Sequence, residues 1–159
     1  AKITPDMRNV VAPCLKRAQE LSAPAAAMEL EDGTIVTGKT SSLLGASAAL
    51  LLNAIKVLGG IPHDVHLIAP SAIEPIQALK TNYLGSRNPR LHTDEVLIAL
   101  SMCAATDPAA KKALDQLPRL KGCQVHTSVM LSNVDIKVFG KLGIELTSEP
   151  VYEHKRLYH

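Results

Sequence analysis

The sequence is poor in aromatic residues and carries almost no net charge. Its 159 residues include three Tyr, one Phe and no Trp, so it offers almost no surface on which nucleic-acid bases could stack. The formal net charge of +2 is too small to indicate a polyanionic partner. We therefore predict that the chain has no nucleic-acid partner.

Cysteine is also scarce. Cys14, Cys103 and Cys123 are far apart and form no Cys-x-x-Cys pair, which argues against a disulfide framework or a zinc ribbon. Reduced thiols are typical of the cytoplasm, and this is the location we predict. The longest apolar stretch, 43–52, is too short to span a bilayer, and no secretory leader opens the sequence, so we predict no membrane partner.

A tight hairpin is the clearest local prediction. Two strand-like runs, 25–31 and 34–38, flank Asp32 and Gly33. An Asp-Gly pair between apolar runs favours a two-residue turn in which both residues adopt positive φ. We therefore expect an antiparallel pair of strands near the start of the fold.

A helix is predicted before this hairpin. Thr4 and Pro5 resemble a helix start, and apolar residues recur at helical spacing over 7–21, although Pro13 should kink or break this helix. The predicted domain organisation is an N-terminal helical lead (1–24), an α/β domain (25–150) and a polar tail (151–159).

After the hairpin, helical and strand-like segments alternate. This order predicts an α/β fold, a layered mixed sheet of four or five strands with helices packed on it. The expected elements are a helix over 43–58, a strand over 65–69, a helix over 71–80, a loop over 81–92, a helix over 93–105, a short helix from Asp107 that stops before Pro118, a strand over 123–131, a helix from Ser132 to Gly143 and a strand over 144–147.

Polar residues predict how several helices begin. Ser41 and its neighbours precede the 43–58 helix, Ser71 stands three residues before Glu74 in a capping-box pattern, and Thr93 precedes an apolar run. Side-chain oxygens at these positions would accept hydrogen bonds from the first free N–H groups of each helix.

The segment 33–40 matches the phosphate-loop pattern G-x-x-x-x-G-K-[ST]. A phosphate loop needs backbone N–H groups curled into a nest, whereas the four residues between the glycines are all β-branched and prefer extended backbone. We therefore expect the second arm of the hairpin. Lys39 and Thr40 remain candidates for nucleotide binding only if a phosphate loop forms.

The order hairpin, helix, strand, helix is similar in pattern to cytidine-deaminase-like domains. The zinc ligands of those enzymes are missing here, since the comparable positions read LGAS over 44–47 and PSAIE over 70–74. His63 and His66 are the remaining metal candidates, together with Asp64, but alternation along a strand would place the two imidazoles on opposite faces. We predict no metal site, and we expect Cys103 and Cys123 to be buried structural thiols.

The richest polar cluster is GSRNPRLHTDE over 85–95. Two guanidinium groups beside a helix start could clamp a phosphate or carboxylate, while an imidazole and two carboxylates could move protons. Alternatively, the arginines pair with the acidic side chains and only order the loop. The candidate ligand-binding residues are Arg87, Asn88, Arg90, His92 and Thr93, and the catalytic candidates are His92, Asp94 and Glu95.

This cluster also carries a family resemblance. GSRNPRLHTDEVLIAL over 85–100 resembles the corresponding stretch of a bacterial family known only as uncharacterised proteins, and so do DGTIVTGKT over 32–40 and HLIAP over 66–70 with EPIQ over 74–77. The resemblance covers about 5–150. It implies the C-terminal domain of a larger cytosolic protein, whose upstream portion carries a glycine-rich, lysine-containing segment and could bind nucleotide. It implies no catalytic residue.

These observations lead to one hypothesis and three alternatives. The hypothesis is an accessory domain without a cofactor of its own, which binds a small anionic ligand of phosphate or nucleotide type through Arg87, Arg90 and His92 and contributes to homo-oligomer contacts. The first alternative is an active site completed by the upstream domain. The second is nucleotide binding through Lys39 and Thr40, and the third is a purely structural dimerisation domain.

Overall fold

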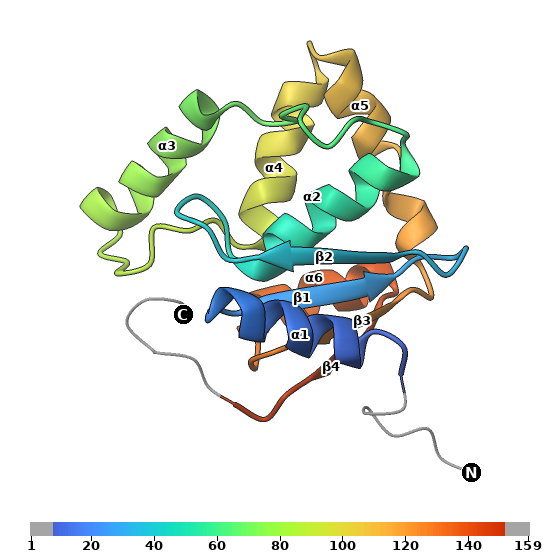
Figure 1. The fold of residues 1–159 in the computed structure, drawn as a ribbon. Coiled ribbons are helices and arrows are strands. Elements are labelled where there is room, and N and C mark those ends of the chain that lie inside the picture. Colours follow the sequence, from blue (N-terminus) through green and yellow to red (C-terminus); the bar gives the residue numbers. More distant parts are fainter. Residues whose placement is uncertain (1–7, 152–159) are drawn as a thin grey trace.

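The structure is a computed structural model that describes residues 8–151 (Figure 1). The elements, in chain order, are α1 (Val11–Leu21), β1 (Ala25–Glu29), β2 (Ile35–Lys39), α2 (Ala46–Leu58), α3 (Pro70–Ala78), the π-helical turn η2 (Leu79–Tyr83), α4 (Thr93–Ala104), α5 (Pro108–Leu114), the 3-10 turn η3 (Leu117–Leu120), β3 (Gln124–Thr127), α6 (Asn133–Leu142) and β4 (Glu145–Ser148).

The strands form one mixed sheet in the order β2-β1-β3-β4. β1 pairs antiparallel with both of its neighbours, and β3 pairs parallel with β4. The predicted α/β fold, with an N-terminal hairpin and a sheet of four or five strands, is therefore confirmed. The cytidine-deaminase-like label is not confirmed and stays a prediction.

Helices cover both faces of the sheet. On one face Val10, just before α1, and Cys14, in its first turn, are buried against Ala27. On the other face Ala26 and Met28 belong to the main core, which α2 also lines. Neighbouring residues of β1 thus serve opposite faces, as strand alternation requires. Beyond α2 lie α4 and α5, while α3 lies at the periphery, with Ile73 buried in the main core (Figure 1).

Gly38, the glycine of the Gly-Lys-Thr sequence, allows β2 and α2 to pack closely together. Gly38 lies in β2 directly under α2, where a Cβ atom would come within 2.4 Å of the Leu50 nitrogen and 2.6 Å of the Ala46 oxygen. Residues 35–39 pair with β1, so their backbone is extended and does not form a phosphate nest. The predicted hairpin arm is confirmed. The predicted two-residue turn is wrong: Gly33 has a φ of 87°, but Asp32 does not have a positive φ, and Gly33 N donates to the Leu30 carbonyl at 2.9 Å in a longer connection.

The strand predicted over 65–69 is wrong. This segment pairs with no strand, yet Leu67 and Ile68 are buried in the main core. An apolar run indicates that a segment is buried, but it does not show that the segment is a strand. Here the buried residues belong to an irregular connection between α2 and α3. The strand predicted over 123–131 is shorter than expected, because β3 ends at Thr127.

The kink expected at Pro13 is also absent. The third residue of α1 is Pro13, and the helix continues without a break from Val11 to Leu21. The first N–H groups of a helix have no intrahelical acceptor, so a proline in the first turn removes no hydrogen bond. The predicted start at Thr4 and Pro5 and the tail 152–159 lie outside the described residues.

Three predicted caps are wrong. α2 begins at Ala46 after Gly45, α3 begins at Pro70 after Ala69, and Thr93 is the first residue of α4 while His92 occupies the cap position. Ser41 instead accepts from the nitrogens of residues 43 and 44, ahead of α2. The start of α2 is delayed by tertiary pairing: Gly45 N donates to the Leu91 carbonyl, which keeps the chain extended up to that point.

The other predicted helix ends are confirmed. Asp107 caps α5 by accepting from Ala109 N at 3.0 Å, and Ser132 accepts from Asp135 N at 3.4 Å. Gly143 ends α6 with φ of 76°. The predicted 81–92 loop begins with the last part of η2.

Within residues 8–151 no helix is long and apolar enough to cross a membrane.

Candidate functional site

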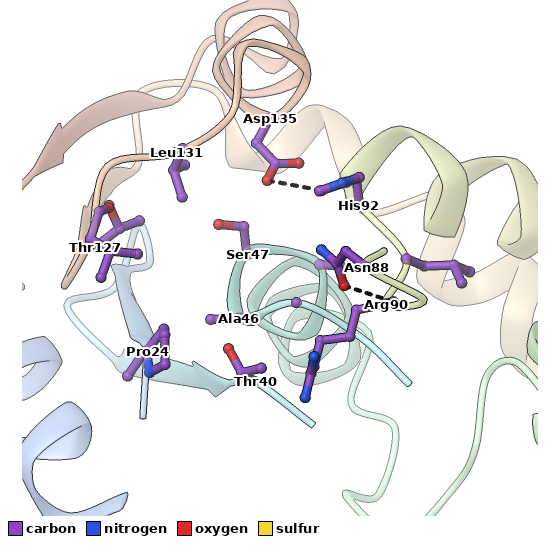
Figure 2. Close-up of a pocket in the computed structure, with 15 residues that line it drawn as sticks. Pro24, Thr40, Ala46, Ser47, Asn88, Arg90, His92, Thr127, Leu131 and Asp135 are labelled. Atoms are coloured by element: carbon purple, nitrogen blue, oxygen red, sulfur yellow. Dashed lines mark hydrogen bonds and ion pairs between the residues drawn. The ribbon is translucent and has the colours of Figure 1, made fainter. Parts of the chain in front are cut away.

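A small pocket opens where the N-terminus of α2 faces the segment before α4, the end of β3 and the first turn of α6 (Figure 2). We call it the α2 pocket. Its volume is about 40 Å³, enough for a few atoms only. Its lining residues are Pro24, Ala25, Thr40, Gly45, Ala46, Ser47, Ala48, Asn88, Arg90, Leu91, His92, Thr127, Val129, Leu131 and Asp135.

The start of α2 supplies backbone donors to this pocket. The first intrahelical hydrogen bond runs from Ala49 N to the Gly45 carbonyl, and no side chain caps the helix. Among the described residues, the N–H groups of Ala46, Ser47 and Ala48 therefore lack an acceptor. Such groups, together with the helix dipole, favour an anion.

Two buried side chains also point toward the α2 pocket. Ser47 is 4% exposed and Asn88 is 2% exposed. Asn88 Oδ1 accepts from Arg90 N at 3.0 Å, but neither the Ser47 hydroxyl nor the Asn88 amide nitrogen has a partner among the described residues. Both residues line the pocket, with the Ser47 hydroxyl toward Thr127 and Leu131 and with Asn88 beside His92 and Arg90 (Figure 2). Because a buried donor without a partner costs free energy, this arrangement suits a ligand that accepts hydrogen bonds.

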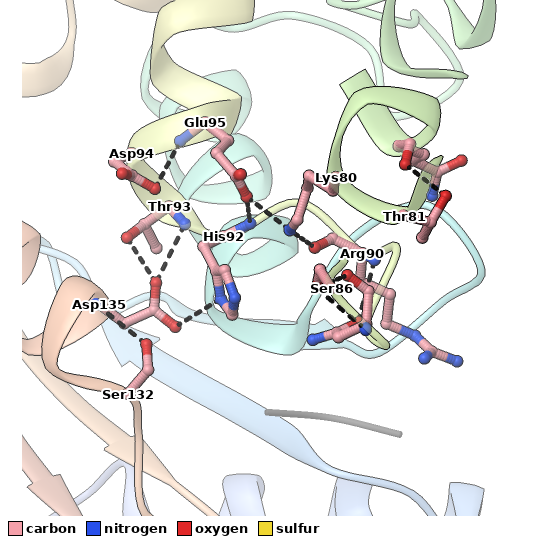
Figure 3. Close-up of polar contacts among 12 residues, drawn as sticks. Lys80, Thr81, Ser86, Arg90, His92, Thr93, Asp94, Glu95, Ser132 and Asp135 are labelled. Carbon is pink, nitrogen blue, oxygen red and sulfur yellow. Dashed lines mark hydrogen bonds and ion pairs between the residues drawn. The ribbon is translucent and has the colours of Figure 1, made fainter. Parts of the chain in front are cut away.

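Arg90 is held in place beside the helix start. Its Nε donates to the Ser41 carbonyl, and its own carbonyl accepts from the ammonium of Lys80. Lys80 is only 6% exposed and pairs with Glu95 at 2.8 Å (Figure 3). Lys80 therefore ties the loop that carries Arg90 to η2 by a hydrogen bond, and it ties η2 to α4 by a partly buried ion pair.

Asp135 occupies the start of α4. Its Oδ1 accepts from the N–H and the hydroxyl of Thr93 at 3.0 and 2.6 Å, and its Oδ2 lies 3.7 Å from Nδ1 of His92 (Figure 3). Glu95 accepts from His92 N at 2.8 Å. The helix end that the sequence analysis proposed for a ligand is thus filled by carboxylates of the chain itself.

The interaction between His92 and Asp135 raises the pKa of His92 and lowers the pKa of Asp135. The carboxylate of Asp135 raises the pKa of His92 against the opposing effect of burial. Burial alone would raise the pKa of Asp135, but the interactions with His92 and Thr93 outweigh it and lower that pKa. His92 consequently holds a proton to higher pH than a free histidine, while Asp135 stays ionised.

Comparison with known proteins decides the family. The model described as "Domain of unknown function DUF1846, C-terminal" matches residues 6–158. The chain belongs to this family. The resemblance read from the sequence is therefore confirmed.

The DUF1846 C-terminal domain is similar to parts of longer proteins. It is 60% identical over 151 residues to a UPF0371 protein of Corynebacterium efficiens, covering 95% of this chain and 30% of that protein. It is 56% identical over 158 residues to one of Corynebacterium glutamicum and 47% identical over 156 residues to one of Streptococcus pyogenes, covering 99% and 98% of this chain and 32% of each relative. The chain thus spans about a third of the length of these relatives.

The structure of this DUF1846 domain brings together only part of the predicted cluster. Asn88, Arg90 and His92 line the α2 pocket, and Thr93 binds Asp135 beside it. Arg87 is exposed and lies outside the pocket lining.

The predicted acids and the nucleotide candidates are also dispersed. Asp94 and Glu95 do not line the α2 pocket: Asp94 accepts from the Glu95 nitrogen, and Glu95 holds Lys80. Lys39 and Thr40 are separated, since only Thr40 lines the α2 pocket. Their proposed roles stay predictions.

Sequence reasoning missed Ser47 and Asp135 in this DUF1846 domain. Ser47 stands in an apolar helix and looks like part of its core, while Asp135, three residues after Ser132, looks like a local feature of the start of its own helix. The sequence signal that could have found Ser47 is Gly45, a residue without a capping side chain two positions before it, but the predicted helix start at residue 43 placed Gly45 inside the helix.

The remaining candidates from the sequence are a metal site and the cysteine thiols. Among residues 8–151, no three His, Cys, Asp or Glu side chains gather as a metal site would require. All three cysteines are free thiols, and burial raises the pKa of Cys14 to about 12 and also raises that of Cys123. The prediction of a buried thiol is confirmed for Cys123 and wrong for Cys103, which is half-buried. High thiol pKa values disfavour a thiolate nucleophile.

Proposed function

We propose that this domain is an accessory module of a longer protein and that it binds a small phosphate-type anion in the α2 pocket. One observation carries the proposal: the free N–H groups at the start of α2 face the same small space as the buried, unpartnered hydroxyl of Ser47. Backbone N–H groups and a hydroxyl are the donors that protein phosphate sites use.

The charges around the α2 pocket support an anion rather than a cation. Arg90 and His92 line it, and the helix dipole adds positive potential at Ser47. The one carboxylate in the lining is Asp135, whose oxygens face Thr93 and His92 at the start of α4. These contacts offset the negative charge of Asp135, so that this carboxylate repels an anion in the pocket less.

The size of the α2 pocket limits the ligand. A volume of about 40 Å³ suits a single phosphate or sulfate group. A nucleotide or another phosphate ester would place only its terminal group inside, with the remainder outside the pocket. The proposed ligand class is therefore inorganic phosphate or a phosphate monoester.

Sulfate binding tests the site. We expect Ser47→Ala to weaken binding of sulfate about tenfold, because it removes a charge-assisted hydrogen bond. The unfolding temperature without sulfate should stay the same or rise, since the hydroxyl has no partner in the free protein. Calorimetric titration and thermal unfolding with and without sulfate measure both quantities.

Arg90→Met and Arg87→Met form a matched pair for the same experiment. Arg90 lines the α2 pocket, so its loss should weaken sulfate binding about tenfold or more, whereas the exposed Arg87 should be neutral. Equal affinities of the wild-type chain, Ser47→Ala and Arg90→Met would overturn the proposal, and so would an equal loss in Arg87→Met and Arg90→Met.

Sulfate affinity should also depend on pH through His92. The charged groups that act on this imidazole are Asp135 on α6, Lys80 on η2 and Glu95 on its own helix. Because its pKa is raised, His92 gains its proton as the pH falls through a value above about 6.5. We expect affinity for sulfate, which does not titrate in this range, to rise about three- to tenfold between pH 8 and pH 6.

The control for this pH effect is a pair of histidine variants. His92→Gln should bind sulfate with little change across the range, and His66→Gln, outside the α2 pocket, should keep the wild-type profile. A flat profile in the wild-type chain, or an unchanged one in His92→Gln, would remove His92 from the site.

A second candidate function follows from the His92–Asp135 pair. An imidazole held by a carboxylate at the edge of an anion pocket could act as an acid or base in an active site completed by the upstream part of the longer protein. Ser47 does not form a catalytic triad with this pair here, since no hydrogen bond joins it to His92. Screening the full-length protein for phosphate-ester turnover, with His92→Gln as comparison, tests this candidate.

Oligomer contacts remain part of the proposal. Ile98 and Met102 lie one turn apart on α4, and both are exposed large apolar side chains that could contact a second copy. Light scattering measures the mass of the chain in solution. A single-chain mass at all concentrations would overturn this part and leave the anion site standing.

A further inference from the structure

A second and larger cavity lies between α2, the 61–69 connection and the start of α3. Its volume is about 360 Å³, and it shares no lining residue with the α2 pocket. We call it the Lys56 cleft. Cavities of this size hold organic molecules rather than single ions.

The walls of the Lys56 cleft are mostly apolar. Among its lining residues, Leu67, Ile68 and Ile73 are buried in the main core. The remaining apolar lining comes from Leu43, Leu44, Ala49, Leu52, Val65 and Pro70. Such walls exclude water from the body of a bound molecule and favour aliphatic or aromatic groups.

The titratable groups that line the cleft are all basic. Its titratable groups are Lys39, Lys56, His63 and His66, and no carboxylate lines it. The metal argument from the sequence placed His63 and His66 on opposite faces of a strand. That argument is wrong because the segment is not a strand, and both residues line the same cleft.

Lys56 carries the strongest indication of a ligand. It is 8% exposed, and among the described residues its ammonium has one hydrogen-bond acceptor, the His63 carbonyl at 2.6 Å. Asp64 is the carboxylate that acts on it, but Asp64 is exposed, and burial still lowers the pKa of Lys56 overall. Buried ammonium groups are normally paired with an anion, and this one meets a neutral carbonyl beside an open cavity.

We infer that the Lys56 cleft binds an organic anion whose apolar body fills the cavity and whose carboxylate pairs with the ammonium of Lys56. Leu44, Leu52 and Ile73 would contact the apolar body, and Lys39 at the rim would add attraction. The chemical class is an amphiphilic monocarboxylate. The inference is independent of the anion proposed for the α2 pocket, because the two sites share no residue.

A purely structural role for Lys56 makes a different prediction. If Lys56 served only to tie the turn at His63 to α2, its replacement would destabilise the free protein and leave ligand binding unaffected. If Lys56 awaits an anion, Lys56→Met replaces an incompletely paired buried charge by an apolar chain of similar length. The free protein should then keep or gain stability.

Decanoate is the probe, and calorimetric titration below its micelle concentration is the measurement. We expect saturable binding of decanoate to the wild-type chain and a loss of about ten- to a hundredfold in affinity in Lys56→Met. Lys112→Met, on the exposed face of α5, is the matched control and should bind decanoate as the wild type does. Decan-1-ol and acetate, which lack the charge or the chain, should each bind at least tenfold more weakly.

Three results would overturn the inference: no saturable decanoate binding to the wild type, equal affinities of the wild type and Lys56→Met, or equal affinities for decanoate and decan-1-ol. Ala49→Leu provides a second variant, because it narrows the cleft without touching Lys56 and should also weaken decanoate binding. Sulfate titration of Lys56→Met separates the two proposals, since binding in the α2 pocket should be unchanged.

Discussion

Gly38→Ala is expected to lower the free energy of unfolding of the domain by about 3 kcal/mol, at the upper end of the cost of overpacking. The added methyl group would meet the Leu50 nitrogen at 2.4 Å and the Ala46 oxygen at 2.6 Å, and both are backbone atoms of α2. A flexible side chain could rotate away from such a contact, but backbone cannot. α2 would have to move off β2, and the buried contacts between them would loosen.

Gly140→Ala is the matched control for this substitution. Gly140 lies in α6, and a Cβ there would meet nothing within 4 Å. Alanine in a helix is favoured over glycine, so this variant should gain about 0.5–1 kcal/mol. Urea unfolding with linear extrapolation measures both variants. Equal stability of Gly38→Ala and the wild type would show that α2 does not need its close approach to β2.

The sequence predicts the parts of this fold that local rules determine. The hairpin follows from Asp32 and Gly33, the start of α5 from Asp107, and the end of α6 from Gly143, each of which acts on residues a few positions away. Alternating helical and strand-like patterns then suffice for the α/β class. These features needed no knowledge of distant contacts.

The errors arise where distant residues decide local structure. Leu67 and Ile68 looked like a strand because they are apolar, but no neighbouring strand is available to pair with them. Ser41 looked like the cap of α2, yet pairing between Gly45 and Leu91 moves the helix start from residue 43 to Ala46, three residues on. The spacing of residue types along the chain does not predict such long-range contacts.

The site shows the same division. The loop residues Asn88, Arg90 and His92 were identified from sequence as polar groups near a helix start, and they do line the α2 pocket. The helix that offers free N–H groups there is α2, because Asp135 arrives from another helix to fill the start of α4. No sequence pattern linked residues 42 positions apart.

Asp135→Ala is expected to lower the free energy of unfolding by about 3 kcal/mol near pH 5.5. The substitution leaves the buried N–H and hydroxyl of Thr93 without their acceptor and removes the countercharge of His92. Asp135→Asn keeps an acceptor oxygen and should cost about half as much. Asp115→Asn is the control, because its exposed pair with Lys111 should contribute within about 0.5 kcal/mol.

The pH profile of stability identifies the His92–Asp135 pair as the source of this cost. The lowered pKa of Asp135 contributes stability that is present above its unfolded value of about 3.9 and is lost as the pH falls through the folded pKa. The raised pKa of His92 contributes stability that is present below about 6.5 and is lost as the pH rises through the folded pKa. The difference in stability between the wild type and Asp135→Asn should therefore be largest between about pH 4 and pH 6.5 and should shrink at pH 8 and at pH 3. A difference that stays constant from pH 3 to pH 8 would mean that Asp135 acts only as a hydrogen-bond acceptor for Thr93 and that its charge contributes nothing to the fold.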